Sequence, residues 1–515
     1  MNGGNTKIDA TIREQGLRPA QIALVALCSL LPAIVKLYYY PDYPGSDDAF
    51  IHFSVIQNIH RGWGWGVNAG EPVFLSTSPL FTVFFSAVRS LTGHVVETGM
   101  ALSLMAGSLY VLGVFVLAIR SCGSFFLSMV CAFLAATNVH LWRWNGTFME
   151  VTFATCAVVW IVALFLSVST TSPRRILAMY PLIGFLTGLG ILLRPEISLI
   201  LPAFFLHSLL NDRIDLGSRY GMLAVGLAVV LGPFAALVHA YFGVFLPTTF
   251  AAKTTTGLVW VNGTVWTQIF KTVASGGCGA GGAVVVLLAL AWRSPARCSL
   301  AEAVRRSAVF WAIPVMGFLF YSLKTTELQS AARYYLPFMG TLPLVLLAAP
   351  NQLSLRPGMV RAVLITACVM QVAVSGVLNH RVVAPVLSRM ASEYIPTMTQ
   401  AAHEVNARAK SGDSLLVYTD IGVVASQLSR SVYLIDGGGL ASPWLQRMSL
   451  GAMVSRTRPR FVLESLGTDP MKVDRALTAG RVTGRLIWSQ AFHSHSVEDA
   501  GIMYVARLYE LDWVQ

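Results

Sequence analysis

"AQIALVALCSLLPAIVKLYYY", residues 20–40, is followed almost at once by "YPGSDDAFIHF", residues 43–53. The first stretch is predominantly apolar and has the length that a helix needs to cross the hydrocarbon core of a bilayer. The second places two adjacent carboxylates, Asp47 and Asp48, just beyond its end. A membrane-spanning helix therefore leads directly into a doubly charged turn at the membrane surface.

The whole chain has the composition of a membrane protein. Its 515 residues are 55% hydrophobic and only 12% charged, and the mean hydropathy is +0.62. Soluble domains carry about 25% charged residues. Repeated apolar runs of bilayer-spanning length predict a polytopic α-helical membrane protein. Residues 1–19 are polar and the run after them lacks a cleavage site of small residues, so we expect a cytoplasmic N-terminus and a retained anchor.

The net charge of +12 does not indicate nucleic-acid binding, because the basic residues are spread over short connections between apolar runs. Topology explains such clusters, since cytoplasmic loops are enriched in Lys and Arg. We therefore expect no nucleic-acid partner. The seven cysteines lie in or beside apolar runs without CxxC spacing, and we interpret them as small hydrophobic residues.

The basic connections also set the number of crossings. If residues 74–91 crossed the membrane, the connections at 172–175, 212–219, 293–297 and 355–361 would lie outside, against the positive-inside bias. If residues 74–91 lie along the outer surface, all four become cytoplasmic. We therefore expect about eleven transmembrane helices within a domain over 20–378, with a first outer loop at 41–98. The expected crossings are 20–40, 100–119, 124–141, 149–169, 176–193, 196–210, 220–242, 280–292, 307–323, 335–349 and 359–378.

After Leu378 the composition becomes that of a soluble domain. Short strands are predicted by apolar, β-branched runs, and a helix is predicted over 421–429. The expected strands are 414–418, 432–436, 460–465 and 506–511. The sequence therefore predicts a small C-terminal α/β domain over 379–515, and the crossing count makes it extracytoplasmic.

Two roles are open for the adjacent aspartates. Residues 47–62 are typical of a short amphipathic helix that ends at Gly62, so one aspartate could cap the helix while the other complements its dipole. Alternatively, a carboxylate accepts the proton of an attacking hydroxyl as a general base. Neighbouring helical residues point about 100° apart, so only one of the two is expected to face the reacting atoms.

Cations expected on the same outer face would complement these carboxylates. Lys253, Arg194 and Arg333 fall in or beside outer loops. A single one could merely extend to lipid head groups, but three of them favour a bound anion such as a lipid phosphate. Further candidates for the pocket are His52, Glu150 and Glu196. His52 and His60 lack partners at metal-ligand spacing, so no zinc site is expected.

Several motifs in order along the chain resemble one family. "SDDAFIHFSVIQNIHRGWGWGVNAGEPV" (46–73) with "TSPL" (77–80) is similar to the first outer loop of bacterial GT-C glycosyltransferases that use polyprenyl-phosphate sugars. These include arabinofuranosyltransferases and mannosyltransferase-like relatives. Further similar segments are "NGTFMEVTF" (145–153), "LLRPEISL" (192–199), "YFGVFLPTTFAAKT" (241–254), "ARYYLP" (332–337) and "DIGVVASQLSRSVYLIDGGGL" (420–440).

The resemblance implies a GT-C fold with surface helices in the first outer loop, and it implies that Asp47 is the catalytic base. It adds Asn58 and Tyr334 to the expected substrate pocket. Thr248 departs from the Asn that is usual in the family, which leaves the donor sugar open. Because the leaving group is a lipid phosphate beside basic residues, the charge count requires no cofactor, and a divalent cation remains an alternative because some GT-C relatives use one.

The leading interpretation is therefore an inverting glycosyltransferase of the bacterial inner membrane. It would move a sugar (arabinose, mannose or another) from a polyprenyl-phosphate donor to a glycan, lipid or protein acceptor. Lys253 and Arg333 would stabilise the departing phosphate, and membrane lipids would surround the protein. The alternative is a lipid or solute transporter or flippase, which predicts charges along a path through the membrane and pseudo-symmetric halves.

The crossing count can be checked by cysteine labelling in intact cells. Single cysteines at Gly70 and Ser414 should react with an impermeant reagent from outside, because both positions lie in expected outer segments. Cysteines at Ser172 and Ser354 should react only after permeabilisation. Labelling of position 172 from outside would mean that residues 74–91 cross the membrane.

Overall fold

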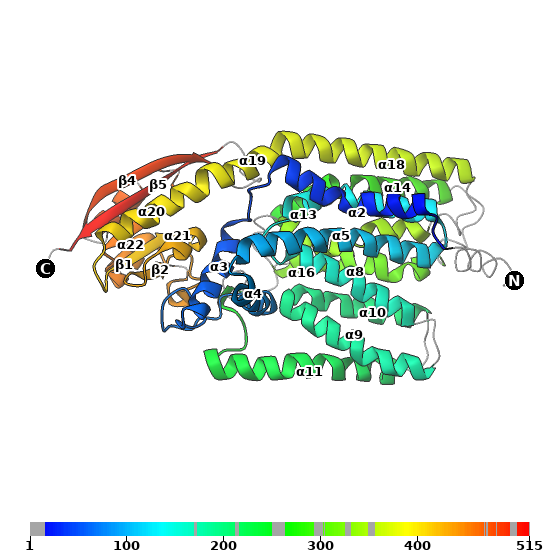
Figure 1. The fold of residues 1–515 in the computed structure, drawn as a ribbon, viewed down its shortest axis with the longest axis horizontal. Helices are drawn as coiled ribbons and strands as arrows, with labels where there is room; N and C mark the ends of the chain where they lie inside the picture. The colour runs from blue at the N-terminus through cyan, green and yellow to red at the C-terminus, as the bar shows by residue number, and fades with distance from the viewer. Residues whose placement is uncertain are drawn as a thin grey trace.

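The computed structural model describes residues 16–168, 173–211, 216–249, 263–292, 302, 304–324, 331–348, 356–446, 448–467, 469, 472–479, 482–494 and 502–513. The molecule is elongated, with a bundle of helices at one end and a sheet-containing domain at the other (Figure 1). The short helices α3 (Asp47–His60) and α4 (Pro79–Thr92) lie where the two parts meet. This end of the bundle is called the domain end below.

The bundle helices lie mostly along the long axis of the molecule (Figure 1). They are α2 (Pro19–Tyr39), α5 (Val95–Cys122), α6 (Phe125–Ala136), α7 (Val139–Trp144), α8 (Val151–Val168), α9 (Pro173–Leu193), η1 (Pro195–Leu199), α10 (Ile200–Asn211), α11 (Leu216–Phe242), α13 (Gly263–Gly276), α14 (Cys278–Trp292), α16 (Ala308–Lys324), α17 (Ala331–Met339), η2 (Leu342–Ala348) and α18 (Pro357–Leu378). Within the described residues, five helices are long and apolar enough to cross a membrane, or six if the bent pair α13–α14 forms one span. The polytopic helical class is thereby confirmed, and the count of eleven crossings stays a prediction.

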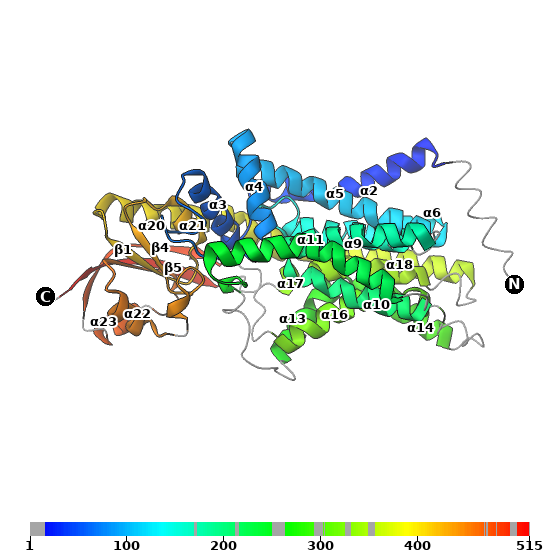
Figure 2. The same cartoon turned by 90° about the horizontal axis from the view of Figure 1, so that it is seen from below.

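Helix α4 is the segment expected to lie along the membrane surface. It runs across the direction of the bundle helices, seen end-on in Figure 1 and from the side in Figure 2. One face buries Phe81 and Phe85 against Trp144 and Phe148. Its other face exposes apolar side chains, among them Val83. This orientation is the one expected of a surface helix, although its depth in a membrane stays a prediction.

The C-terminal domain is built on a five-stranded sheet in the order β2-β1-β3-β5-β4. Its strands are β1 (Ser414–Tyr418), β2 (Tyr433–Asp436), β3 (Phe461–Gly467), β4 (Thr483–His493) and β5 (Met503–Asp512). β2, β1 and β3 are parallel, and β5 and β4 add an antiparallel half. Its helices are α21 (Gly422–Gln427), η5 (Pro443–Leu445), α22 (Leu450–Thr457) and α23 (Lys472–Ala479). The expected strands match four of the five, but β4 is missed because its residues are mostly exposed and give no apolar alternation.

One helix connects the two parts of the molecule. Helix α18 continues through α19 (Ala384–Arg389) into α20 (Ile395–Arg408), so that residues 357–408 form one helix of 52 residues. Two π-helical turns interrupt it, at Asn379–Val383 and Met390–Tyr394. A π turn inserts an extra residue and changes the direction in which the following side chains point. Tyr394, at the end of the second π turn, points at the start of α3.

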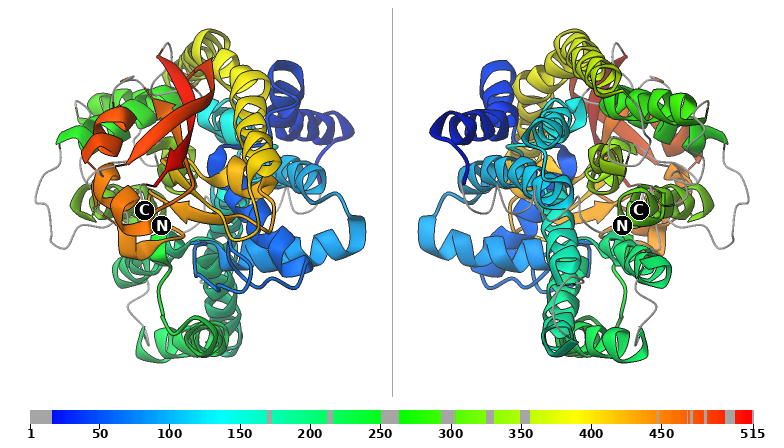
Figure 3. Two further views of the ribbon diagram at one scale, coloured as in Figure 1. Left: turned by 90° about the vertical axis from the view of Figure 1, so that its left-hand side faces the viewer. Right: turned by 90° about the vertical axis from the view of Figure 1, so that its right-hand side faces the viewer.

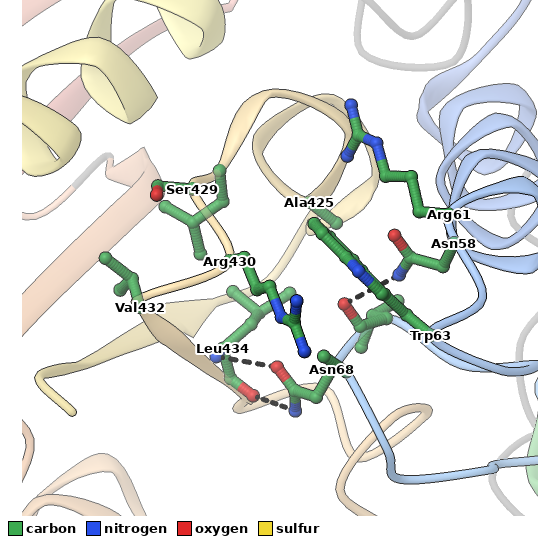
Figure 4. Close-up of a pocket in the computed structure, with 12 residues that line it drawn as sticks. Asn58, Arg61, Trp63, Asn68, Ala425, Ser429, Arg430, Val432 and Leu434 are labelled. Carbon is green, nitrogen blue, oxygen red and sulfur yellow. Dashed lines mark hydrogen bonds between the residues drawn. The ribbon is translucent and has the colours of Figure 1, made fainter. Parts of the chain in front are cut away.

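The loop between α3 and α4 is fastened to the C-terminal domain (Figure 4). The Asn68 amide pairs with both backbone groups of Leu434, at 2.9 Å each, on the edge strand β2. The Trp63 ring lies near the guanidinium groups of Arg61 and Arg430, 4.9 and 5.2 Å from its centroid. Because an edge strand leaves backbone groups unpaired, Asn68 both satisfies this edge and fixes the loop.

The chain enters α3 through a turn held by Lys36. The Lys36 side chain is buried, and its ammonium donates to the carbonyl oxygens of Tyr40 at 2.5 Å and Tyr43 at 2.7 Å. Gly45 follows at φ +140°, where a Cβ would lie 2.9 Å from the Ala49 side chain. The turn therefore requires the Lys36 cation and a glycine at position 45 to place Asp47 and Asp48 at the start of α3.

Replacing Lys36 by Met should destabilise the protein by about 2 kcal/mol, because buried carbonyl oxygens lose a charged donor. Thermal unfolding of the purified protein in detergent measures the effect, with Lys271→Met on an exposed position of α13 as the control. An unchanged midpoint for Lys36→Met would show that the turn does not depend on this ammonium.

Candidate functional site

Asp47 and Asp48 both lie in the first turn of α3, but their carboxylates face different parts of the molecule. The N-cap of α3 is Ser46, whose side chain makes no capping hydrogen bond, and neither aspartate caps its own helix. The capping role considered from sequence is therefore wrong. The two negative charges still lie where the α3 dipole favours them.

The Asp47 carboxylate is bound by the C-terminal domain and the connecting helix. Oδ2 accepts a hydrogen bond from the backbone N–H of Gly422 at 2.6 Å, and Oδ1 accepts from Val423 N–H and the Tyr394 hydroxyl at 3.0 Å each. Only 7% of the residue is exposed. Burial, reinforced by the nearby Asp420 carboxylate, raises the pKa of Asp47.

The Asp48 carboxylate faces the bundle and forms an ion pair with Arg333 of α17. The Asp48 side chain is 32% exposed, and that of Arg333 is 11% exposed. Another guanidinium nitrogen of Arg333 donates to the Tyr334 hydroxyl at 3.3 Å, while its buried Nε finds no hydrogen-bond partner among the described residues. Asp48 and Arg333 thus form a charged pair that an approaching substrate can reach.

Arg194 occupies a more enclosed position behind this pair. It donates to Glu150 at 2.9 Å and to Glu196 at 3.2 Å, and its side chain is only 4% exposed. A buried ion is tolerated when its partners satisfy it. Arg194 already has two carboxylate partners, so its charge is balanced without a bound phosphate.

His52 lies one turn after Asp48 and faces the same group of side chains. Its Nδ1 is 3.2 Å from the Thr82 hydroxyl, and its Nε2 is 3.8 Å from a Glu150 oxygen. Burial lowers the pKa of His52. The Tyr334 ring lies 5.2 and 5.0 Å from the guanidinium carbons of Arg194 and Arg333.

Seven residues therefore meet at the domain end and are called the charged cluster below. They are Asp48, His52, Glu150, Arg194, Glu196, Arg333 and Tyr334. All seven were expected from sequence as site residues, although they come from four separate segments of the chain.

The remaining expected residues lie elsewhere. Asn58 donates to the carbonyl oxygens of Gly66 and Val67 and so holds the turn of the first loop (Figure 4). Lys253 lies outside the described residues. Within the described ranges, no three His, Cys, Asp or Glu side chains are grouped as metal ligands, and use of a divalent cation stays a prediction.

Sequence reasoning missed three residues around Asp47, namely Tyr394, Asp420 and Gly422. The "DIG" segment begins two positions after the last residue of strand β1, and the carboxyl ends of parallel strands commonly form binding edges, so a signal for Asp420 and Gly422 was present. Tyr394 gave no signal, because its direction depends on a π turn that no sequence pattern indicated.

An apolar groove of about 970 Å³ runs beside the cluster, between α4, α11 and the loop after α3. Helix α4 contributes to both: Thr82 contacts His52, while Pro79 and Val83 on the adjacent face of the helix line the groove. The groove is further lined by Ile59, His60, Gly62, Gly64, Trp65, Phe74, Ser86, Ala87, Ser90, Phe234, Leu237, Val238, Tyr241 and Phe242.

No family model matches the chain. No curated protein sequence matches it either. Solved structures do: the crystal structure of ArnT from Cupriavidus metallidurans bound to undecaprenyl phosphate superposes with a TM-score of 0.57 at 13% identity, over 93% of this chain and 97% of ArnT. The apo structure of the same protein gives 0.58 and 14%, over 94% and 97%.

The chain has an ArnT-like fold. The likeness extends over nearly the full length of both chains, so it includes the bundle as well as the C-terminal domain. The expected arabinofuranosyltransferase or mannosyltransferase subgroup stays a prediction.

The two arginines of the charged cluster should respond differently to loss of charge. Arg194→Gln should cost about 3–5 kcal/mol, because it leaves the buried Glu150 carboxylate and the partly buried Glu196 carboxylate without their cation. Arg333→Gln should cost much less, because its partner Asp48 is one-third exposed and can be hydrated. Unfolding midpoints in detergent test this order, and equal losses for both variants would contradict it.

Proposed function

We propose that this protein is a membrane glycosyltransferase that transfers a pentofuranose or hexose from a polyprenyl-phosphate donor. The acceptor would be a hydroxyl of an envelope glycan, lipid or protein at the outer face of the bacterial inner membrane. The observation that carries the proposal is an accessible carboxylate–arginine pair beside a large apolar groove, at the domain end of an ArnT-like fold. ArnT itself was crystallised with undecaprenyl phosphate.

In the proposed reaction, the acceptor oxygen forms a bond to the anomeric carbon as the bond from that carbon to the phosphate oxygen breaks. The leaving polyprenyl phosphate takes the electron pair, and a carboxylate of the Asp47–Asp48 turn takes the acceptor proton. The configuration at the anomeric carbon inverts, because the acceptor attacks opposite the leaving group. Arg333 and Lys253 would stabilise the charge that develops on the phosphate.

The groove supports a lipid-linked donor. Its lining is mainly aromatic and aliphatic, and it contacts α11, one of the helices apolar enough to cross a membrane. An isoprenoid chain is itself apolar and gains free energy by leaving water. A chain in this groove would bring its phosphate towards the charged cluster around the end of α4.

The residue that departs from the family pattern lies at the contact with the C-terminal domain. Thr248, which stands where the family usually has Asn, donates to the carbonyl oxygen of Leu440 at 2.7 Å. This side chain therefore contributes to the contact with the C-terminal domain. Mass analysis of envelope glycans and glycoproteins from a deletion strain would identify the missing sugar.

Purified protein with a synthetic polyprenyl-phosphate sugar and an envelope extract should transfer the sugar and release polyprenyl phosphate. Lys253→Ala should lower kcat/KM by about 10²-fold or more, as expected when one donor to developing negative charge is lost. Arg333→Lys should fall between wild type and Arg333→Ala, because lysine keeps the charge but lacks the planar fork.

Lys271→Ala, at an exposed position of α13, is the matched control and should keep the wild-type rate. Movement of the intact lipid between leaflets of a vesicle, without release of polyprenyl phosphate, would instead indicate the flippase. Wild-type kinetics in both Lys253→Ala and Arg333→Ala would place the phosphate elsewhere.

A further inference from the structure

The carboxyl edge of a parallel sheet is where α/β domains usually bind their ligands. In the C-terminal domain this edge lies after β1, where Asp420 and Gly422 lead into α21. The Asp47 side chain, at the start of α3, reaches this edge and accepts hydrogen bonds from its backbone amides. A residue of the same chain therefore occupies the position that a ligand would take.

The fit around Asp47 is close. A Cβ at Gly422 would collide with the Asp47 backbone oxygen and would come within 2.8 Å of its carboxylate, so the approach of α3 to α21 requires glycine here. Ile421, the N-cap of α21, offers no side-chain acceptor to the first amides of the helix. Asp47 supplies that acceptor from another part of the chain.

The connecting helix completes the enclosure. The Tyr394 hydroxyl, directed by the second π turn, donates to Asp47 Oδ1 and also lies 3.5 Å from the Asp420 carboxylate. Both Asp47 oxygens are thus engaged by donors, two on Oδ1 and one on Oδ2. A carboxylate held in this way has little room to meet a substrate hydroxyl.

We propose that Asp47 is a positioning residue that docks the C-terminal domain onto α3, and that Asp48 is the carboxylate that accepts the acceptor proton. This division of roles rests on the proposed function, and it departs from the role that the family resemblance implied for Asp47. It assigns the reacting role to the aspartate whose side chain is one-third exposed and faces Arg333.

The Asp48–Arg333 ion pair explains how Asp48 would act as the base while Asp47 does not. Arg333 neutralises Asp48 while no donor is bound. The donor phosphate is a diester with one negative charge and becomes a dianion as its bond to the sugar breaks. The guanidinium turns to this developing charge and releases Asp48 to accept the proton of the acceptor hydroxyl. The direction of Asp48 follows from Asp47, because the two residues are about 100° apart on one helix whose start is fixed by the docked domain.

Isosteric substitutions distinguish the two roles, because asparagine is not a base but keeps one acceptor oxygen. At position 47 this oxygen can still accept from the Val423 amide and the Tyr394 hydroxyl, and only the bond from Gly422 is lost. In the full-length protein, with the synthetic polyprenyl-phosphate sugar, Asp47→Asn should lose less than about tenfold in kcat. Asp48→Asn should lose about 10³-fold or more, within the range of general-base catalysis. Binding of the donor lipid to Asp48→Asn should stay within about threefold of wild type. Formate, as a small external base, should partly restore Asp48→Ala and leave Asp47→Ala inactive.

A second measurement reports docking without activity. Amide hydrogen exchange over residues 420–427 should increase in Asp47→Ala and remain close to wild type in Asp48→Asn. Gly422→Ala is the matched control, because it displaces Asp47 while keeping its carboxylate. Gly422→Ala should therefore show the same increase in amide exchange and the same loss of transferase activity as Asp47→Ala.

The outcomes separate the two proposals. If Asp47→Asn is as inactive as Asp48→Asn and its amide exchange over 420–427 is normal, Asp47 is the base and this inference is overturned. Unchanged exchange in Asp47→Ala would overturn the docking role. No transfer by the wild-type protein would instead contradict the proposed glycosyltransferase, and the exchange experiment would still decide whether Asp47 docks the domain.

Discussion

The structure depends on one buried carboxylate that is shared between two parts of the chain. Ionised groups are expensive to bury, and Asp47 is accommodated because backbone amides of α21 and the Tyr394 hydroxyl converge on it. This interaction fixes the start of α3 against the C-terminal domain. Asp48 is the next residue of the helix, and its side chain therefore faces the bundle. The position of the charged cluster is therefore a consequence of domain docking as well as of bundle packing.

The buried charges at the domain end fall into two groups that differ in how easily they exchange partners. Arg194 is enclosed by Glu150 and Glu196 and serves as a fixed support. Arg333 has a single, partly hydrated carboxylate partner among the described residues and a buried nitrogen without one. In the proposed reaction, Arg194 would keep the surroundings of the site fixed, as electrostatic preorganisation requires, while Arg333 would exchange its carboxylate for the donor phosphate.

Much of this could be predicted from sequence, because the decisive signals are local. Apolar runs identified the bundle, and the segments that flank them supplied the residues of the charged cluster. The role of Asp47 could not be predicted, because its partners Gly422 and Tyr394 lie more than 300 positions away in the chain. Gly422 binds it through a backbone amide, and Tyr394 binds it through a hydroxyl that a π turn directs. Strand β4 was missed for another reason: an exposed edge strand lacks the apolar alternation that identifies strands.

The helix over residues 357–408 has a mechanical consequence. At about 1.5 Å per residue, its 52 residues extend about 78 Å, more than twice the thickness of a bilayer core. Helices tilt when the surrounding lipid is thinner than their apolar length. Tilting α18 would swing Tyr394 at the far part of the same rod, and with it the hydroxyl that holds Asp47. A change in lipid thickness that tilts α18 would then reach the Asp47 carboxylate through this helix, and the two π turns are the points at which the helix could bend instead.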